Sequence, residues 1–345
     1  DAAMVDGADA VVRVEDTDAG QDRVLVRRAV PSGANLRRAG EGARAGEVVL
    51  TAGTTLNAGH LGVAASSGLA ELTVVSPARV AVVTTGDELV AVGDPLAPGQ
   101  IHESNAVVAA ALVRSAGADV SVHHSPDDAP ALRRLLEELA STHDVVVSTG
   151  GVSMGAEYDS VRVALADADV EVVALWIRPA KPLAFGSIGD ALFVGLPGNP
   201  VSVVVSFELF VRPALRALAG IEPAVPPMVA GPAGERITHH GGPATHFLRV
   251  RRTADGWVST GSGGSHLIAG IAAADALAVV PPGHDVGPGE PLALLPLWTT
   301  CSVPQFLRPG VRTAGQNRWG GPSGQEPAGG GEVLGSGGVA VRGAV

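Results

Sequence analysis

Two carboxylates in a short loop are the first candidates for a chemical role. Asp87 and Glu88 follow Thr85 and Gly86, directly after the apolar run at residues 80–84. Carboxylates at such a place can hold Mg²⁺ or orient a polar ligand, and the glycine permits close approach to the backbone. A turn in which Asp87 accepts hydrogen bonds from neighbouring N–H groups would need the same residues, so the loop by itself leaves both interpretations open.

A glycine-rich loop at residues 150–155 is suited to a phosphate group. It reads Gly-Gly-Val-Ser-Met-Gly and follows the hydroxyl side chains of Ser148 and Thr149, so its backbone N–H groups can turn toward an anion. It matches neither the Walker A loop nor the GxGxxG dinucleotide motif, and a tight strand-to-helix turn would use the same glycines. Asp159 follows at the expected start of a helix, where it either caps the helix or serves as a metal or ligand carboxylate.

A third loop, at residues 195–202, reads Gly-Leu-Pro-Gly-Asn-Pro-Val-Ser. Its two prolines stiffen the chain and Gly198 permits close approach of a ligand, while Asn199 and Ser202 can each cap the helix that follows. A rigid helix cap would account for most of this composition. The presence of three such loops in one segment is what favours a ligand site.

Lys181 is the only lysine of the chain, and every other basic residue apart from the histidines is an arginine. A compact ammonium group suits a phosphate or another oxyanion, whereas a lysine that persists by chance on the surface needs no ligand. Histidines occur as the adjacent pairs 123–124 and 239–240, which is not the i, i+4 spacing of helical metal ligands. We therefore interpret these histidines as surface or packing residues.

The elements that must position these loops alternate between strands and helices. Strands are expected at residues 80–84, 119–122, 144–148, 170–176, 183–185 and 191–195, and helices at 105–116 (capped by Asn105), 129–140, 159–166 and 200–218. Apolar strands at this spacing predict a parallel sheet covered by helices on both faces. In such sheets ligands bind beyond the carboxyl ends of the strands, where all three loops are expected to lie.

Shorter elements flank this central segment on both sides. Strand-like runs occur at residues 10–14, 23–26, 47–50 and 72–75, with a short helix ending near Gly68, and later at 247–251, 257–260, 276–280 and 292–297. The sequence therefore predicts a multidomain chain with a three-layer α/β central domain between small, mostly β domains. The expected limits are 1–42, 43–76, 77–222 and 223–298, and the glycine-rich residues 299–345 predict a disordered tail.

Composition excludes several classes of protein. The 24 basic and 35 acidic residues give a formal net charge of −11, so neither nucleic acid nor a membrane surface is an expected partner. The single cysteine, Cys301, excludes an internal disulfide and cysteine-ligated zinc or iron–sulfur sites. The apolar run at residues 201–205 is far shorter than the roughly 20 residues that span a bilayer, and no secretory signal opens the sequence, so we expect a soluble cytoplasmic protein.

Taken together and in this order, the motifs resemble those of the molybdopterin molybdenumtransferases, the family of the bacterial MoeA proteins and the gephyrin E domain. The resemblance covers about residues 8–298. Its main segments are Thr85 to Leu89, Gly99 to Ile101 with Ser104 and Asn105, Ser148 to Gly155, Lys181 and Pro182 with Ala184 to Gly186, and Leu196 to Ser202. Further similar segments are Gly7 to Val12 with Glu15 to Thr17, Gly33 to Arg37 with Gly40 and Glu41, Phe247 to Arg249, and Gly261 to Gly263.

The resemblance implies a transferase of molybdenum cofactor biosynthesis, which inserts molybdate into adenylylated molybdopterin at a Mg²⁺-assisted site and releases AMP. It also implies an elongated homodimer with the site in a cleft at the subunit interface. The implied partners are a molybdopterin adenylyltransferase upstream and molybdoenzymes or their chaperones downstream. Cationic groups, N–H donors and a metal ion are what the transfer of an oxyanion with cleavage of a phosphoanhydride requires.

Carried over onto this sequence, the resemblance implies that Asp159, Lys181 and Glu88 are catalytic and that Asp87 and Asp159 are metal ligands. The residues that it implies for binding molybdopterin are Thr85, Gly86, Ser148, Gly150, Gly151, Ser153, Gly155, Pro197, Gly198, Asn199 and Pro200.

The sequence departs from the family pattern in several places. The family segment Ser/Ala-Met-Asp-Gly-Tyr/Phe-Ala, which carries a catalytic aspartate, would precede Asp1, so we expect an N-terminally incomplete chain with a partial first domain. Gly42 replaces an aspartate, Ala180 replaces a glycine, and one residue is inserted before Asp159. Two alternatives therefore stay open: a molybdopterin adenylyltransferase, and a catalytically inactive molybdopterin-binding or scaffold protein.

Overall fold

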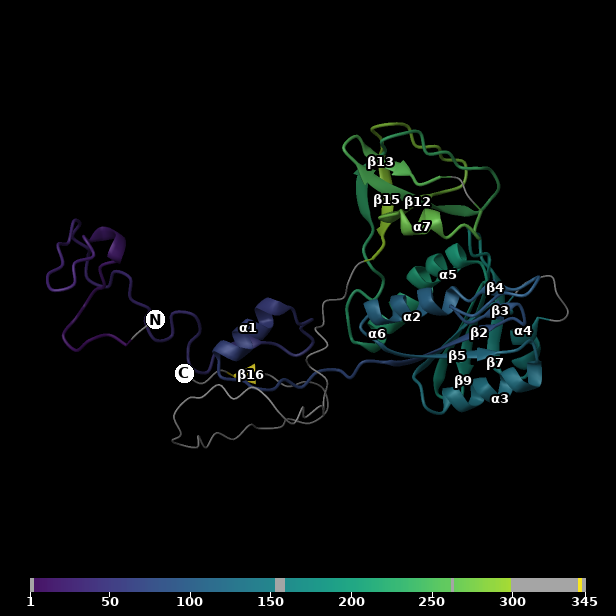
Figure 1. The fold of residues 1–345 in the computed structure, drawn as a ribbon, viewed down its shortest axis with the longest axis horizontal. Helices are drawn as coiled ribbons and strands as arrows, with labels where there is room; N and C mark the ends of the chain where they lie inside the picture. The colour runs from purple at the N-terminus through teal and green to yellow at the C-terminus, as the bar shows by residue number, and fades with distance from the viewer. Residues whose placement is uncertain (1–2, 153–158, 262–263, 299–340, 343–345) are drawn as a thin grey trace. The chain divides into compact units, whose positions relative to one another are not determined.

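The computed structural model describes residues 3–152, 159–261, 264–298 and 341–342. The chain divides into two compact units, one of residues 1–73 with 319–345 and the other of residues 74–318 (Figure 1). The tail expected over residues 299–345 lies outside the described residues apart from Val341–Arg342. No helix in the described ranges is long and apolar enough to cross a membrane.

Among its described residues, the first unit contains little regular structure. It comprises a 3-10 turn η1 (Val14–Asp16), strand β1 (Val48–Leu50), helix α1 (Ala58–Ser66) and strand β16 (Val341–Arg342), which pairs antiparallel with β1. Asn57 and His60 close a capping box at the start of α1: the His60 N–H donates to Asn57 Oδ1 and the Asn57 N–H donates to His60 Nδ1, both at 3.1 Å. Gly68 follows the helix with a φ of +79°.

Three strands expected in the N-terminal part do not form. Residues 10–14, 23–26 and 72–75 lie outside every strand, and one isolated bridge joins Thr17 to Val26. Leu25 is 65% exposed and Val75 62%, so the apolar side chains of these runs are not packed against another element. A strand without a packed face gains little stability from its side chains. Residues 72–75 instead form the connection between the two units.

A six-stranded sheet forms the centre of the second unit. Its order is β5 (Asp119–Ser125), β2 (Arg79–Thr85), β6 (Val145–Thr149), β10 (Ala191–Leu196), β9 (Pro182–Ile188) and β7 (Asp169–Ala174). The first four strands are parallel, and β9 is antiparallel to both of its neighbours. The valines at positions 80, 82, 83 and 145–147 are fully buried, as a sheet covered on both faces requires.

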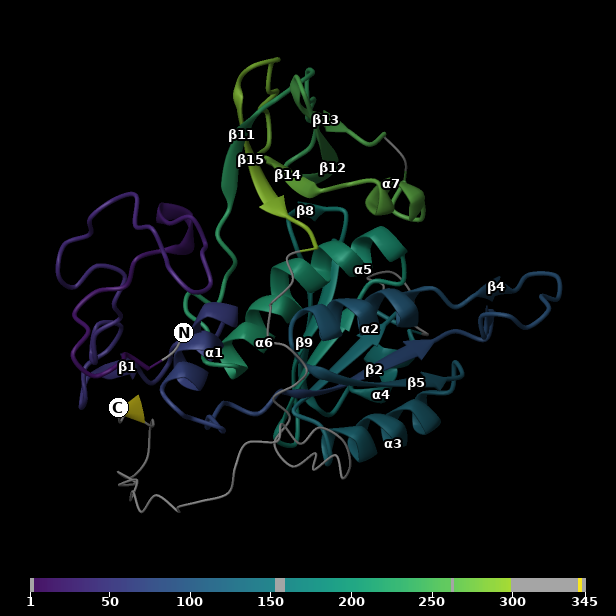
Figure 2. The same cartoon turned by 60° about the vertical axis from the view of Figure 1, so that its left-hand side comes forward.

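Helices cover both faces of this sheet and complete three layers (Figures 1 and 2). One face packs against α2 (Asn105–Ser115) and the continuous helix of α5 (Pro200–Ser206), the π-helical segment η2 (Phe207–Val211) and α6 (Arg212–Leu218). The other face packs against α3 (Ala129–Ala140) and α4 (Ser160–Ala164). In α3 the leucines at 132, 136 and 139 are buried at helical spacing, which confirms that predicted helix to the residue.

The prediction that Asn105 caps α2 is wrong. Ser104 occupies the N-cap position and makes no side-chain capping bond, and Asn105 is the first helical residue. The Asn105 amide Nδ2 donates instead to the Gly198 carbonyl at 2.6 Å. The side chain is therefore committed to a loop distant in sequence, which local capping rules cannot foresee.

A second sheet is built by the C-terminal strands β11 (Val229–Pro232), β12 (Thr245–Thr253), β13 (Gly256–Ser259), β14 (Ala276–Val280) and β15 (Pro291–Pro296), with helix α7 (Ala269–Ala272). Its strands pair antiparallel in the order β11-β15-β14-β12-β13. Strand β8 (Ile177–Arg178) belongs to the α/β segment in sequence but pairs with β12. Two further short strands, β3 (Leu89–Val90) and β4 (Ile101–His102), pair with each other beyond β2.

The two sheets of the second unit share one apolar cluster. Phe247 and Leu277 of the C-terminal sheet lie in the same cluster as Val201 and Val205 of α5. The Val201 N–H also donates to the Ser265 carbonyl at 3.0 Å. The loop after β10 is therefore held between the two sheets.

Candidate functional site

The three predicted loops lie together at one edge of the parallel sheet. The Gly150 N–H donates to the Leu196 carbonyl at 3.0 Å, which joins the loop after β6 to the end of β10. Gly150 has a φ of +89°, and a Cβ built on it would lie 3.2 Å from both the carbonyl and the hydroxyl oxygen of Thr85. A Cβ on Gly198 would lie 3.5 Å from the Gly150 Cα. Glycine at these positions lets the ends of β2, β6 and β10 approach closely.

Buried polar atoms surround this convergence. Within the described part of the chain, four side-chain oxygens near it are buried and make no hydrogen bond: Ser148 Oγ, Thr149 Oγ1, Glu103 Oε2 and Asn105 Oδ1. Buried polar groups in proteins are nearly always paired, so a cluster of unpaired ones indicates a place where a polar ligand or ordered water completes the hydrogen bonds. Ser148 was predicted to bind molybdopterin, and Thr149 was noted as a hydroxyl residue before the glycine-rich loop. Nothing in the sequence indicated a role for Glu103.

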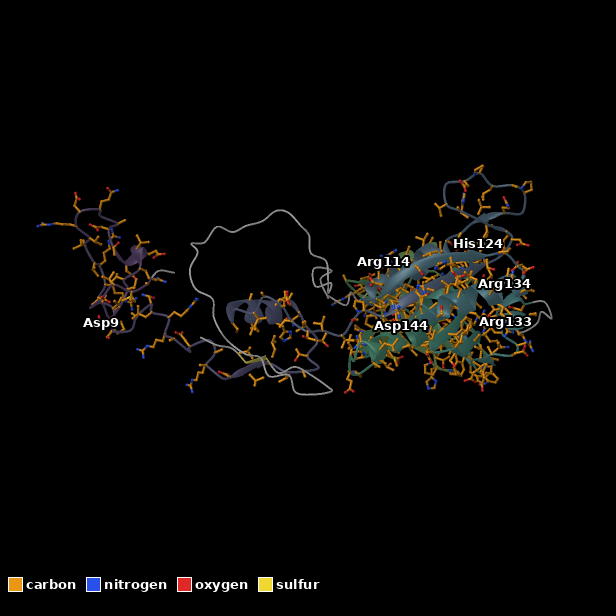
Figure 3. The ribbon with its side chains drawn as sticks, turned by 90° about the horizontal axis from the view of Figure 1, so that it is seen from below. Asp9, Arg114, His124, Arg133, Arg134 and Asp144 are labelled. Carbon is orange, nitrogen blue, oxygen red and sulfur yellow. The ribbon has the colours of Figure 1, made fainter. Side chains whose placement is uncertain are left out.

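Two carboxylates meet at the neighbouring strand ends. The Asp87 N–H donates to Asp127 Oδ2 at 3.3 Å and the Asp127 N–H donates to Asp87 Oδ1 at 3.1 Å. Asp127 lies two residues after the end of β5, the parallel strand at the edge of the sheet. His124 of this strand (Figure 3) has its Nδ1 3.2 Å from the Thr84 hydroxyl. Sequence reasoning missed Asp127 because it ended this strand at residue 122, three residues short of its observed end.

The start of α4, where Asp159 and Ser160 lie, contacts the same group through Ser160. Asp159 occupies the N-cap position of α4 and is 6% exposed, but its side chain makes no capping hydrogen bond. The following residue, Ser160, donates its hydroxyl to Asp127 Oδ1 at 3.4 Å. Asp87, Asp127 and the start of α4 are therefore connected, and Asp87, Glu88 and Asp127 are all exposed at this edge of the sheet. The predicted residues Ser153 and Gly155 lie outside the described part of the chain.

The carboxylates of Asp87 and Asp127 fit a magnesium ion that a phosphate of the substrate also holds. Among the described residues no three His, Cys, Asp or Glu side chains are placed to form a metal site by themselves. Mg²⁺ is, however, commonly bound by one or two carboxylates together with substrate phosphates, and the donors here are all oxygens. Asp87 and Asp127, with the Ser160 hydroxyl beside them, meet that requirement.

Lys181 lies in a separate cavity of about 720 Å³ between the α/β segment and the C-terminal sheet. Three arginines, Arg178, Arg236 and Arg249, line it as well, and no acidic side chain occurs among its described lining residues. Residues 197–199 of the third loop also line the cavity, so it borders the strand-end site. The described lining therefore carries four cationic side chains, of which Arg236 pairs with Asp285 at 3.8 Å, and the positive charge of the others favours an anion in the cavity.

Arg249 and Asn199 fix the wall of the cavity. The Arg249 guanidinium donates to the Leu267 carbonyl at 3.0 Å and to the Gly261 carbonyl at 3.2 Å, and its burial lowers its pKa. Asn199 occupies the N-cap position of α5, but its side chain does not cap the helix; its Nδ2 donates to the Ser265 hydroxyl at 2.9 Å. Arg249 belonged to a recognised sequence segment, yet no role for it was predicted, since its partners come from a loop that forms only in the fold.

Comparison with known proteins agrees with this arrangement. Three family models match the chain: the MoeA N-terminal region (domain I and II) at residues 2–68, the probable molybdopterin binding domain at 81–217, and the MoeA C-terminal region (domain IV) at 231–297. A crystal structure of the molybdopterin biosynthesis MoeA protein from Pyrococcus horikoshii superposes with a TM-score of 0.66 at 26% identity, covering 83% of this chain and 71% of that one. The predicted fold class, an α/β central domain with flanking β domains, is confirmed.

Curated relatives give the family directly. Molybdopterin molybdenumtransferase 2 of Mycobacterium tuberculosis is 39% identical over 279 residues, which cover 72% of this chain and 69% of that protein. Molybdopterin molybdenumtransferase of Nostoc sp. is 34% identical over 308 residues, which cover 86% of this chain and 70% of that protein. At this identity and coverage, the chain belongs to the molybdopterin molybdenumtransferase family.

Proposed function

We propose that this protein is the molybdenumtransferase of molybdenum cofactor biosynthesis, which inserts molybdate into adenylylated molybdopterin and releases AMP. The observation that carries the proposal is the cavity beside Lys181, which has four cationic side chains and no acid among its described lining residues. Molybdate is a small oxyanion, and cationic hydrogen-bond donors are the groups that bind such an anion. Residues 197–199 line the same cavity and place it next to the strand ends, where the pterin would lie.

Each part of the site has a distinct role in this proposal. Lys181 and Arg178 bind the oxyanion, and the glycine loops that contain Gly150 and Gly198 hold the phosphate-bearing pterin through backbone N–H groups. Asp87 and Asp127 hold Mg²⁺, which when bound supplies positive charge to the phosphates of the leaving nucleotide.

The other members of the predicted site keep roles of the same kind. Asp159, which precedes Ser160 at the start of α4, is a further metal ligand in this proposal, and Glu88 orients the pterin from the loop after β2. Ser148, Thr85 and their neighbours provide the hydroxyl and carbonyl groups that contact the pterin.

We further infer that the protein acts in the cytoplasm as a homodimer. It would receive its substrate from a molybdopterin adenylyltransferase and pass the cofactor to molybdoenzymes or their chaperones. The alternative in which the chain is itself an adenylyltransferase has less support, because the models that match on both sides of the central domain are those of MoeA. Sedimentation equilibrium would test the dimer, and a monomer at micromolar concentration would contradict it.

Steady-state assays of AMP release test the proposed roles separately. Lys181→Ala should raise the KM for molybdate by about 10- to 100-fold, since a hydrogen bond to a charged group contributes about 1.5–3 kcal/mol and 1.4 kcal/mol corresponds to tenfold. Asp87→Asn should instead raise the Mg²⁺ concentration needed for half-maximal rate. Arg134→Ala is the control, because Arg134 is exposed on α3 and does not line the cavity (Figure 3). Binding of adenylylated molybdopterin without any AMP release would favour the inactive binding protein.

A further inference from the structure

A buried histidine with no hydrogen-bond partner lies in the wall of the cationic cavity. His246 of β12 is 1% exposed, and among the described residues neither of its ring nitrogens has a hydrogen-bond partner. It is nevertheless one of the residues that line the cavity beside Lys181. A neutral imidazole carries one donor and one acceptor, and leaving both unmet in the interior is unfavourable. Because the ring lines the cavity and its nitrogens are not held in one protonation state by a described partner, an anion bound in the cavity can change its protonation.

Positive and potentially positive groups surround this ring. The His239 ring stacks on it at a centroid distance of 3.9 Å, and the His240 ring lies 6.0 Å away. Arg178 of β8 is its register partner across the sheet, whereas its partner on β14 is the uncharged Val280.

Asp285, an acid that contacts the neighbouring His239, is already engaged. Asp285 accepts the His239 backbone N–H at 2.9 Å and pairs with Arg236 at 3.8 Å. Glu235, the carboxylate between β11 and β12, accepts the Ser259 backbone N–H at 2.7 Å, and the charges that shift the pKa of His246 are those of His239, Arg178 and His240.

These surroundings keep His246 neutral while the cavity holds no anion. Burial, followed by the neighbouring charges of His239, Arg178 and His240, lowers the pKa of His246 to about 4. The shift has the sign expected for a base held among cations in a poorly solvated place. A dianion bound in the same cavity offsets the positive charge of these neighbours and so favours the protonated, imidazolium form of His246.

We propose that His246 is the proton acceptor that tunes the oxyanion cavity, so that entry of a dianion such as molybdate is coupled to protonation of His246. This inference rests on the proposed function, because it takes the cavity as the oxyanion site. His246 acts here through charge and is a positioning residue, not a catalytic one. Affinity for the dianion then rises as the pH falls, by up to tenfold per pH unit where one whole proton is taken up.

Calorimetry of molybdate binding measures the coupling directly. Titrations of the whole chain at pH 6 and pH 8, each in two buffers that differ in ionisation enthalpy, give the number of protons taken up per anion. We expect a clear uptake at pH 6 that falls toward zero at pH 8. His246→Gln should remove the uptake, and His284→Gln should keep it, because His284 is exposed in the same C-terminal segment and does not line the cavity. Sulfate serves as a second probe, since it stays a dianion across this range.

The outcomes separate this inference from the proposed function. Molybdate that binds with an affinity lowered by Lys181→Ala, but without proton uptake or with the same uptake in His246→Gln, overturns the role of His246 and leaves the oxyanion cavity intact. Molybdate that does not bind, or whose affinity is indifferent to Lys181→Ala, overturns both. If His246→Gln fails to fold, NMR titration of the His246 ring in the unaltered protein decides: its pKa must rise when molybdate is present, and an unchanged pKa refutes the coupling.

Discussion

Gly150 offers a quantitative test of how closely the strand-end loops pack. Gly150→Ala places a methyl group on a residue with a φ of +89°, at 3.2 Å from two oxygens of Thr85. Gly189→Ala is a matched control, because Gly189 also has a positive φ, of +58°, but a Cβ on it would meet no atom within 4 Å. The difference between the two variants isolates the crowding against Thr85.

The expected magnitudes follow from these two geometries. A left-handed backbone costs an alanine roughly 1–2 kcal/mol, of which about 0.4–1 kcal/mol is recovered because alanine restricts the unfolded chain. Gly189→Ala should therefore lower the free energy of unfolding by about 1 kcal/mol. Gly150→Ala adds an overpacking term of about 1–3 kcal/mol and should lower it by about 2–4 kcal/mol.

Urea unfolding measures both variants, and AMP release reports the effect on the site. Because the loops must shift to admit the methyl group, Gly150→Ala should reduce the rate of AMP release at least about tenfold, whereas Gly189→Ala should leave it unchanged. Equal destabilisation by the two substitutions, together with unchanged AMP release in Gly150→Ala, would refute the close approach of the loops after β2 and β6.

Three further predictions concern positions outside the strand-end loops. Ala180 has a φ of +79° but is buried in the core, so in Ala180→Gly the relief of about 1–2 kcal/mol of backbone strain is offset by the lost methyl group and the freer unfolded chain. The free energy of unfolding should change by less than about 1 kcal/mol, and a loss of about 2 kcal/mol or more in urea would contradict this. Asp144, which Figure 3 labels, accepts a hydrogen bond from the Arg79 guanidinium at 2.9 Å, and this lowers the pKa of its carboxyl. Arg79→Met should therefore destabilise the protein at pH 7, and in pH-dependent unfolding the difference should vanish as the pH falls well below 4. Arg212 and Glu208 form a buried ion pair at 2.8 Å. Arg212→Met alone should lower the free energy of unfolding by about 3–5 kcal/mol, because it leaves the buried carboxylate unpaired. The double variant with Glu208→Leu should lower it by less, which thermal unfolding can measure.

The central sheet could be predicted from the sequence because its strands are buried on both faces. Such strands appear as short, nearly continuous apolar runs, and those at residues 80–84, 144–148 and 191–195 fall within one residue of β2, β6 and β10. The N-terminal runs had a similar composition but no surface on which to pack, and composition alone does not distinguish the two cases. The limits of the flanking domains stay predictions.

The site could be predicted only in part, because its members come from loops that meet through tertiary structure. Gly150, Gly198 and Thr85 were predictable, since glycine loops after parallel strands gather at one edge. Asp127 was hidden by the two polar histidines before it, which break the apolar pattern of β5. The cationic cavity could not be foreseen, because Arg249 of β12 and Arg236 of the segment before β12 reach it from a domain whose packing against α5 no local pattern reveals.

The central claim is that this chain transfers molybdenum onto molybdopterin, and its most direct test is to measure the product itself. The chain is incubated with adenylylated molybdopterin, Mg²⁺ and molybdate, the pterin is separated, and its molybdenum content is determined beside the AMP released. We predict equal amounts of AMP and molybdenum-loaded pterin, formed only with molybdate and reduced in Lys181→Ala. Adenylylated pterin that binds but is recovered intact and free of molybdenum would contradict the account.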